Sequence, residues 1–130
     1  MSLRFHPLGS ALALLYMAGV VRMSSVSGRQ LAQWGWPPSW LDWVHVPLFA
    51  GMALVTLWAI VGPPRTLRAA LVMAVCMVFA VSDEWHQSYV PGRVSSLSDL
   101  RFDALGTSLG IAAGVALRAL GGIWRGAGER

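Results

Sequence analysis

Charged residues are scarce in this chain of 130 residues. Asp, Glu, Lys and Arg make up 12% of it and the hydrophobic residues 55%, whereas an ordinary soluble domain is roughly 25% charged. A soluble globule of this composition would lack the polar side chains that must cover its surface. The scarcity therefore indicates an integral membrane protein, because four spans of about 20 residues, the length that crosses ~30 Å of hydrocarbon, would use most of the chain.

Lysine is absent, and cysteine occurs once. The ten basic residues are all arginine and lie scattered between apolar runs, so the net charge of +4 does not indicate a nucleic-acid partner. We interpret the arginines as orienting the protein in the membrane and meeting anionic head groups. The lone Cys76 excludes an intramolecular disulfide, and its apolar surroundings predict a small buried side chain.

Long apolar runs predict four helices, at residues 8–26, 41–62, 67–87 and 97–120. Pro63 and Pro64 end the second run, because proline lacks the backbone donor. Strands are not expected, since the runs show no strict alternation and an open sheet edge would be unsatisfied in lipid. The prediction is an all-α integral membrane bundle of about four transmembrane helices. It forms one domain over residues 1–124, with a short tail at 125–130.

Polar and aromatic residues are unevenly divided between the two predicted membrane faces. Four spans place both termini on one face, which holds six arginines against four on the other, and this favours cytoplasmic termini. The opposite face collects five acids and a belt of interfacial aromatic residues. These are Asp42, Asp83, Glu84, Asp99 and Asp103, and Trp34, Trp36, Trp40, Trp43, Trp85 and Tyr89.

Three polar segments are expected to converge on this outward face. Asp42 and His45 lie three residues apart at the start of the second helix, so they share one side of it. Glu84 and Gln87 have the same spacing at the end of the third helix, and Asp83 lies one turn before Gln87. The third segment contains Arg93, Asp99, Arg101 and Asp103.

The fourth helix carries a stripe of small residues in register with two acids. Asp99 and Asp103 are one turn apart, and Gly106, Gly110 and Gly114 continue their side of the helix. Small residues in this register let two helices approach closely in lipid. Both aspartates are therefore predicted to face the bundle interior.

The cost of burying charge predicts a shared polar pocket. An ionised group at the bilayer centre costs ~2.5–3.5 kcal/mol, so the acids should pair with Arg93, Arg101 or His45 in a wet pocket, which is a functional candidate. Structural alternatives stay open. Asp99 or Asp42 could cap a helix, His45 could be a satisfied core histidine, and the tryptophans could be membrane anchors.

These motifs resemble the VanZ-like family of small bacterial membrane proteins, named for a member associated with teicoplanin resistance. The likeness rests on residues 82–93 (SDEWHQSYVPGR), 95–99 and 103–106, and on Gly110, Asp42 and His45. Two positions depart from the family pattern: Trp43 stands where a lysine is common, and Asp103 where many members have asparagine. The resemblance implies a multi-pass protein of the bacterial inner membrane and cell envelope, and supplies no established reaction.

The leading hypothesis is a pocket that binds or modifies an anionic or polyol head group of a membrane lipid or lipid-linked envelope precursor, with a glycopeptide-resistance-type role. Arg93 would clamp the anion, because its planar guanidinium meets phosphate or carboxylate through two hydrogen bonds. Glu84 would be a general base or an acceptor, His45 a proton relay and Asp99 a further catalytic candidate. The other expected ligand-binding residues are Asp42, Asp83, Gln87 and Asp103.

Other functions stay open at this point. Buried ionisable residues also mark transporters and proton-conducting proteins, and a structural scaffold would need no pocket. No cofactor is predicted. A divalent metal remains an alternative, because the acids and histidines of this face are hard or borderline metal ligands. Against it, no two histidines have a metal-ligand spacing such as H-x-x-x-H. The sequence decides neither whether the pocket catalyses a reaction nor whether the protein forms a homo-oligomer.

Overall fold

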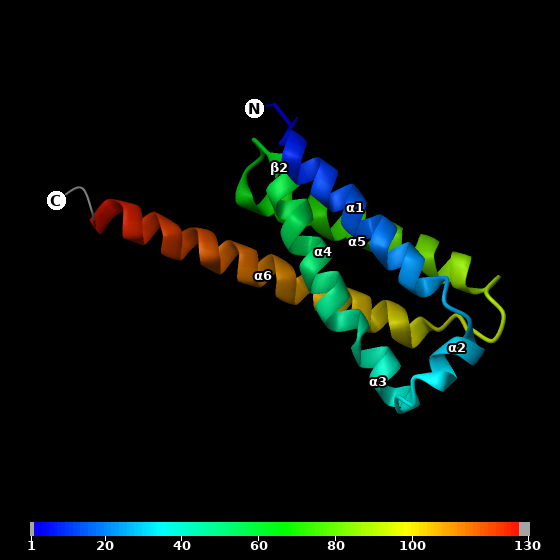
Figure 1. Ribbon diagram of the computed structural model, residues 1–130. Coiled ribbons are helices and arrows are strands. Elements are labelled where there is room, and N and C mark those ends of the chain that lie inside the picture. Colours follow the sequence, from blue (N-terminus) through cyan, green and yellow to red (C-terminus); the bar gives the residue numbers. More distant parts are fainter. Residues whose placement is uncertain (1, 128–130) are drawn as a thin grey trace.

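Helices form almost all of the structure. The computed structural model describes residues 2–127, with side chains 38, 39 and 121–127 outside the description. The elements in chain order are β1 (Arg4–Phe5), α1 (Pro7–Ser24), α2 (Gly28–Gln33), α3 (Pro38–Trp43), α4 (His45–Ala59), β2 (Ile60–Val61), α5 (Arg65–Gln87) and α6 (Leu97–Ala127) (Figure 1). Four segments, 7–24, 40–59, 65–87 and 97–120, are long and apolar enough to cross a membrane. The prediction of an all-α, multi-pass membrane bundle is confirmed.

The predicted second helix is wrong in its bounds, because it is broken near its start. α3 ends at Trp43 and α4 begins at His45. Pro47 explains the break, since a proline lacks the N–H that would bond the carbonyl four residues earlier, here that of Trp43, and its ring clashes with that carbonyl. The bonds on either side survive, from Val44 N to the Trp40 carbonyl at 3.1 Å and from Leu48 N to the Val44 carbonyl at 3.3 Å. The kink turns the chain directly beside His45.

Three short segments, α2, β1 and β2, were not predicted. The first predicted helix stops at Ser24, and a capping box of Ser27 and Gln30 starts the six-residue helix α2. The second predicted helix stops at Ala59, where β2 pairs antiparallel with β1. The expectation that the chain holds no strand is therefore wrong for these two-residue segments. Their backbone groups satisfy each other next to the ends of α1 and α4.

α6 is longer than predicted. It continues past residue 120 to Ala127, so residues 125–127 of the expected tail are helical, and residues 128–130 lie outside the described part. In Figure 1 its C-terminal half extends away from the other helices.

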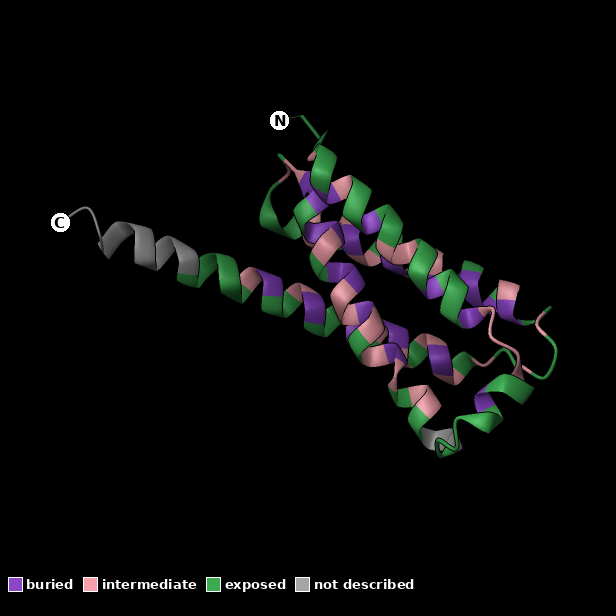
Figure 2. Ribbon diagram, in the orientation of Figure 1, coloured by how far each residue is buried: buried purple, intermediate pink, exposed green. Residues whose placement is uncertain are grey.

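α4 lies at the centre of the bundle and packs against α1, α5 and most extensively α6. Buried residues lie where the helices face each other (Figure 2), and the core includes Phe49, Met52 and Cys76, all at most 1% exposed. The glycine stripe of α6 makes the α4 contact possible. A Cβ on Gly106 would overlap the Val46 carbonyl oxygen, and one on Gly110 would lie 2.9 Å from Ala50 Cα. The predicted packing role of the stripe is confirmed.

The segment that follows α1, including α2, meets the α5–α6 loop at one end of the bundle, opposite the β1–β2 pair (Figure 1). Gly28 N donates to the Pro91 carbonyl at 3.0 Å, and a Cβ on Gly28 would overlap the Gly92 carbonyl oxygen. Gly92 has a backbone φ of +74°, an angle that residues other than glycine rarely adopt. This contact fixes the turn that carries Arg93. The expected aromatic belt surrounds this end, and its members Trp40, Trp43, Trp85 and Tyr89 are all exposed.

Candidate functional site

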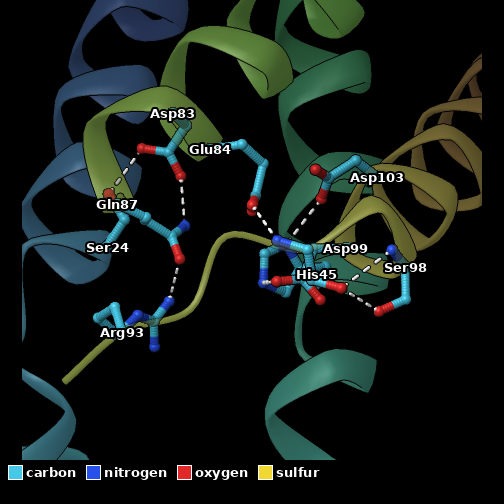
Figure 3. A network of polar contacts seen from close by, with 10 residues as sticks. Ser24, His45, Asp83, Glu84, Gln87, Arg93, Ser98, Asp99 and Asp103 are labelled. Atoms are coloured by element: carbon cyan, nitrogen blue, oxygen red, sulfur yellow. Dashed lines mark hydrogen bonds and ion pairs between the residues drawn. The ribbon is translucent and has the colours of Figure 1, made fainter. Parts of the chain in front are cut away.

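A cluster of buried polar side chains occupies the end of the bundle where the loops meet (Figure 3). α1, α4, α5, α6 and the α5–α6 loop each contribute to it, so residues far apart in sequence lie together. Seven of its members are at most 8% exposed: Ser24, His45, Asp83, Glu84, Gln87, Asp99 and Asp103. The prediction that Asp99 and Asp103 face the bundle interior is confirmed.

One part of the cluster is a chain of hydrogen bonds that ends on Arg93. Ser24 Oγ donates to Asp83 Oδ1 at 2.6 Å, Gln87 Nε2 donates to Asp83 Oδ2 at 3.0 Å, and Arg93 donates to Gln87 Oε1. The orientation of the Gln87 amide follows from its neighbours, because a carboxylate only accepts and a guanidinium only donates. Asp83 therefore acts on Arg93 through Gln87, and Ser24 ties the chain to α1.

The second part is an imidazole between two carboxylates. His45 Nδ1 lies 2.8 Å from Asp103 Oδ1, and His45 Nε2 lies 4.0 Å from Asp99 Oδ2. Since an ionised carboxylate is an acceptor, Nδ1 carries the hydrogen toward Asp103 and Nε2 is left to gain or release a proton. Asp103 orients the ring in the way that a buried carboxylate orients a catalytic or ligating histidine.

Glu84 holds the start of α6. Its Oε2 accepts from Ser96 N at 2.8 Å, and its Oε1 is buried without a hydrogen-bond partner among the described residues. Ser96 Oγ in turn accepts from Ser98 N at 3.1 Å, so this serine supplies the side-chain cap. The Asp99 carboxylate is thereby free to face His45, and the alternative in which Asp99 is only a cap is not supported.

A cavity of about 640 Å³ opens beside the cluster. Its polar wall is formed by Ser24, Asp42, His45, Asp83, Gln87, Arg93 and Asp99. Its other walls are apolar and come from α1, α2, the α2–α3 connection, α3, α4 and the α5–α6 loop. They include Val20, Met23, Leu31, Trp34, Trp36, Leu41, Leu48, Phe49 and Val94. Glu84 and Asp103 are not among the lining residues, so they support the polar wall from behind.

Most of this wall was predicted from the sequence, but some of its parts were misplaced. Of the three expected partners of the acids, His45 forms both ion pairs found among the described residues, and Arg93 reaches Asp83 through Gln87. Arg101 is exposed and does not line the cavity. Asp42 lines the cavity, but the kink separates its helix from that of His45. Its capping role is not observed, since no side chain caps the start of α4. Ser24 was not predicted as a site residue, and no spacing signal connects it with Asp83 across 59 residues of chain.

The acids and histidines of the cluster were also compared with the arrangement of a metal centre. Within residues 2–127 no group of three or more His, Cys, Asp or Glu side chains is arranged to hold a metal ion. The arrangement instead provides one guanidinium, one oriented imidazole and carboxylate acceptors beside an apolar chamber. Such a site can bind an amphiphile and can move a proton at His45 Nε2.

Comparison with known proteins identifies a family. The profile of the VanZ/LLP1 family matches residues 4–118, a stretch that contains every residue of the polar wall. Neither the curated proteins nor the solved structures include a significant match to the chain.

Proposed function

Because the chain belongs to the VanZ/LLP1 family and crosses the membrane several times, we propose that it binds the head group of an envelope lipid or lipid-linked precursor in this cavity. One observation carries the proposal. The same cavity of about 640 Å³ is lined on one side by Arg93, His45 and carboxylates and on the others by apolar side chains. A ligand that is polar at one end and apolar at the other matches both linings.

Arg93 is the proposed contact for an anionic group of the ligand. A guanidinium carries five N–H donors, and the hydrogen bond to Gln87 uses one of them. Arg93 Nε is buried without a partner among the described residues, so this donor is also not consumed by the protein there. Because the chain from Ser24 through Asp83 and Gln87 holds the guanidinium in place, little side-chain entropy is lost when it binds an anion.

Proton transfer, where the bound head group is modified, is assigned to His45. His45 lines the cavity while Asp103 holds its Nδ1, so Nε2 is the nitrogen left for an acid–base role. Glu84 is the weaker candidate for the base, because it does not line the cavity and one of its oxygens is committed to Ser96 N. Asp99, 4.0 Å from Nε2, is suited to stabilising the protonated ring.

The test compares the lipids that copurify with the protein and its variants. We expect an amphiphile with a phosphate or carboxylate to be retained by the purified wild type and depleted in Arg93→Gln, measured by mass spectrometry of extracted lipid. Arg101→Gln is the matched control, since Arg101 is exposed away from the cavity. Arg93→Lys should retain an intermediate amount, because it keeps the charge but not the planar fork. Equal lipid content in the two glutamine variants, both folded by size exclusion, would contradict the proposal.

The cellular role that we propose is in the bacterial envelope, in the inner membrane, with cytoplasmic termini and the cavity facing outward. The family's association suggests a glycopeptide-resistance-type effect. We expect expression in a teicoplanin-sensitive bacterium to raise the concentration of teicoplanin that inhibits growth. Arg93→Gln should abolish this increase at equal protein level. A transporter would behave differently: proton flux in reconstituted vesicles that Glu84→Gln abolishes would favour that alternative over a binding pocket.

A further inference from the structure

The cavity contains more acids than an anionic ligand alone would favour. Its lining includes the carboxylates of Asp42, Asp83 and Asp99 but only one guanidinium, that of Arg93, and the imidazole of His45. Two further buried carboxylates, of Glu84 and Asp103, stand behind this wall. A purely anionic head group on Arg93 would add like charge to a site already rich in it, which opposes binding.

Two of the lining carboxylates have acceptor capacity to spare. Asp83 is engaged through both oxygens, by Ser24 and Gln87. In contrast, Asp42 is half-buried, and both ion pairs among the described residues belong to His45, which leaves Asp42 without a cationic partner there. Asp99 lies 4.0 Å from a histidine nitrogen, beyond hydrogen-bond distance.

These two carboxylates belong to helices that touch. α3 packs against α6 through Trp43 and Phe102, whose ring centroids are 4.9 Å apart, and the two acids line the same cavity. Asp42 adjoins Trp43 and Asp99 lies three residues before Phe102, so each acid is next to this contact as well as in the cavity lining.

An aromatic pair borders the same cavity. Trp34 and Trp36 line it with ring centroids 5.7 Å apart and planes at 63°, and both are partly exposed, at 43% and 48%. The face of an indole ring attracts a cation, and the attraction is stronger where water is excluded. Free carboxylates together with indole rings are a combination that favours an ammonium group.

We infer that the ligand is a zwitterionic phospholipid, with its phosphate on Arg93 and its protonated amine between Asp42 and Asp99 beside the two tryptophans. The inference rests on the proposed function and adds the charge of the head group. The ammonium compensates the excess of carboxylates, and the acyl chains lie along the apolar walls.

The experiment titrates the detergent-purified protein with short-chain phosphatidylethanolamine and with phosphatidylglycerol of the same chains, by calorimetry. We expect the amine lipid to bind roughly tenfold more tightly. Asp42→Asn should remove this preference by weakening the amine lipid alone, and Asp42→Glu should largely restore it. Trp36→Phe should reduce the preference. Trp85→Phe should not, because Trp85 is 67% exposed and does not line the cavity.

The outcomes separate the two proposals. If phosphatidylglycerol binds as tightly as the amine lipid, or if Asp42→Asn leaves the preference unchanged, the zwitterionic assignment is wrong while the lipid site stands. If neither lipid binds in a way that Arg93→Gln abolishes, the proposed function itself fails. Binding of soluble phosphoethanolamine as tight as that of the lipid would also overturn the inference, because the occupant would then be a free metabolite.

Discussion

Replacing Gly106 by alanine should separate α6 from α4 and damage the site at a distance. A Cβ at this position would overlap the Val46 carbonyl oxygen and lie 3.0 Å from Val46 C and Cα. These atoms are backbone, so the helix must move as a body. Overpacking of this kind costs about 1–3 kcal/mol, and the better helix propensity of alanine returns at most about 1 kcal/mol. With the full propensity gain subtracted, we expect a net loss of about 0–2 kcal/mol in the free energy of unfolding.

Two other glycines calibrate this prediction. A Cβ added to Gly19 in α1 would have nothing within 4 Å of it, so Gly19→Ala should be neutral or stabilising. A Cβ on Gly114 would meet the side-chain ends of Leu57 at 2.7 Å and Leu54 at 3.2 Å, which can rotate, so Gly114→Ala should cost less than Gly106→Ala. The assay is unfolding by detergent titration, followed by circular dichroism. If Gly106→Ala is as stable as Gly19→Ala, the close packing of α4 on α6 is refuted.

Three further predictions concern the polar wall. Gln87→Glu places an acceptor where Asp83 needs a donor, so lipid binding should fall and the melting temperature should drop, as measured by calorimetry and thermal unfolding. Asp103→Asn keeps an acceptor for His45 and should be tolerated, whereas Asp103→Leu leaves a buried donor unpaired and should cost about 1–3 kcal/mol; equal unfolding free energies would contradict this. Gly28→Ala should push the adjoining turn outward and weaken lipid binding more than stability, and unchanged affinity would show that this contact does not position the site.

The sequence predicted the bundle because its signals were strong and local. Runs of apolar residues fixed the number of spans, and the spacing of Asp99, Asp103 and the glycines gave the side of α6 that faces inward. The kink at Trp43 was missed although Pro47 is visible in the sequence, because the apolar run passes through it without interruption. The helix α2 is only six residues long, too short for periodicity to reveal.

The sequence predicted which side of a helix a site residue occupies better than whether that residue borders the cavity or lies behind it. Helical spacing showed that Glu84 and Gln87 share a side, but it could not show that Gln87 borders the cavity and Glu84 lies behind it. Likewise, Arg93 and Arg101 are equally plausible partners for the acids in sequence. Only the turn at Gly92, held against Gly28, brings Arg93 inward, and this long-range contact leaves no periodic trace.

The contacts that hold the charged residues around the cavity imply that the cavity is formed before a ligand binds. The contact of Gly28 with the Pro91–Gly92 turn holds the backbone next to Arg93. The hydrogen bonds that run from Ser24 through Asp83 and Gln87 hold its guanidinium. His45 is fixed by Asp103 and by the kink that begins α4. A site whose charged groups are already oriented loses little entropy on binding. Selectivity between head groups should therefore come from the charges that line the cavity, and single isosteric substitutions of those charges should change affinity without a change in fold.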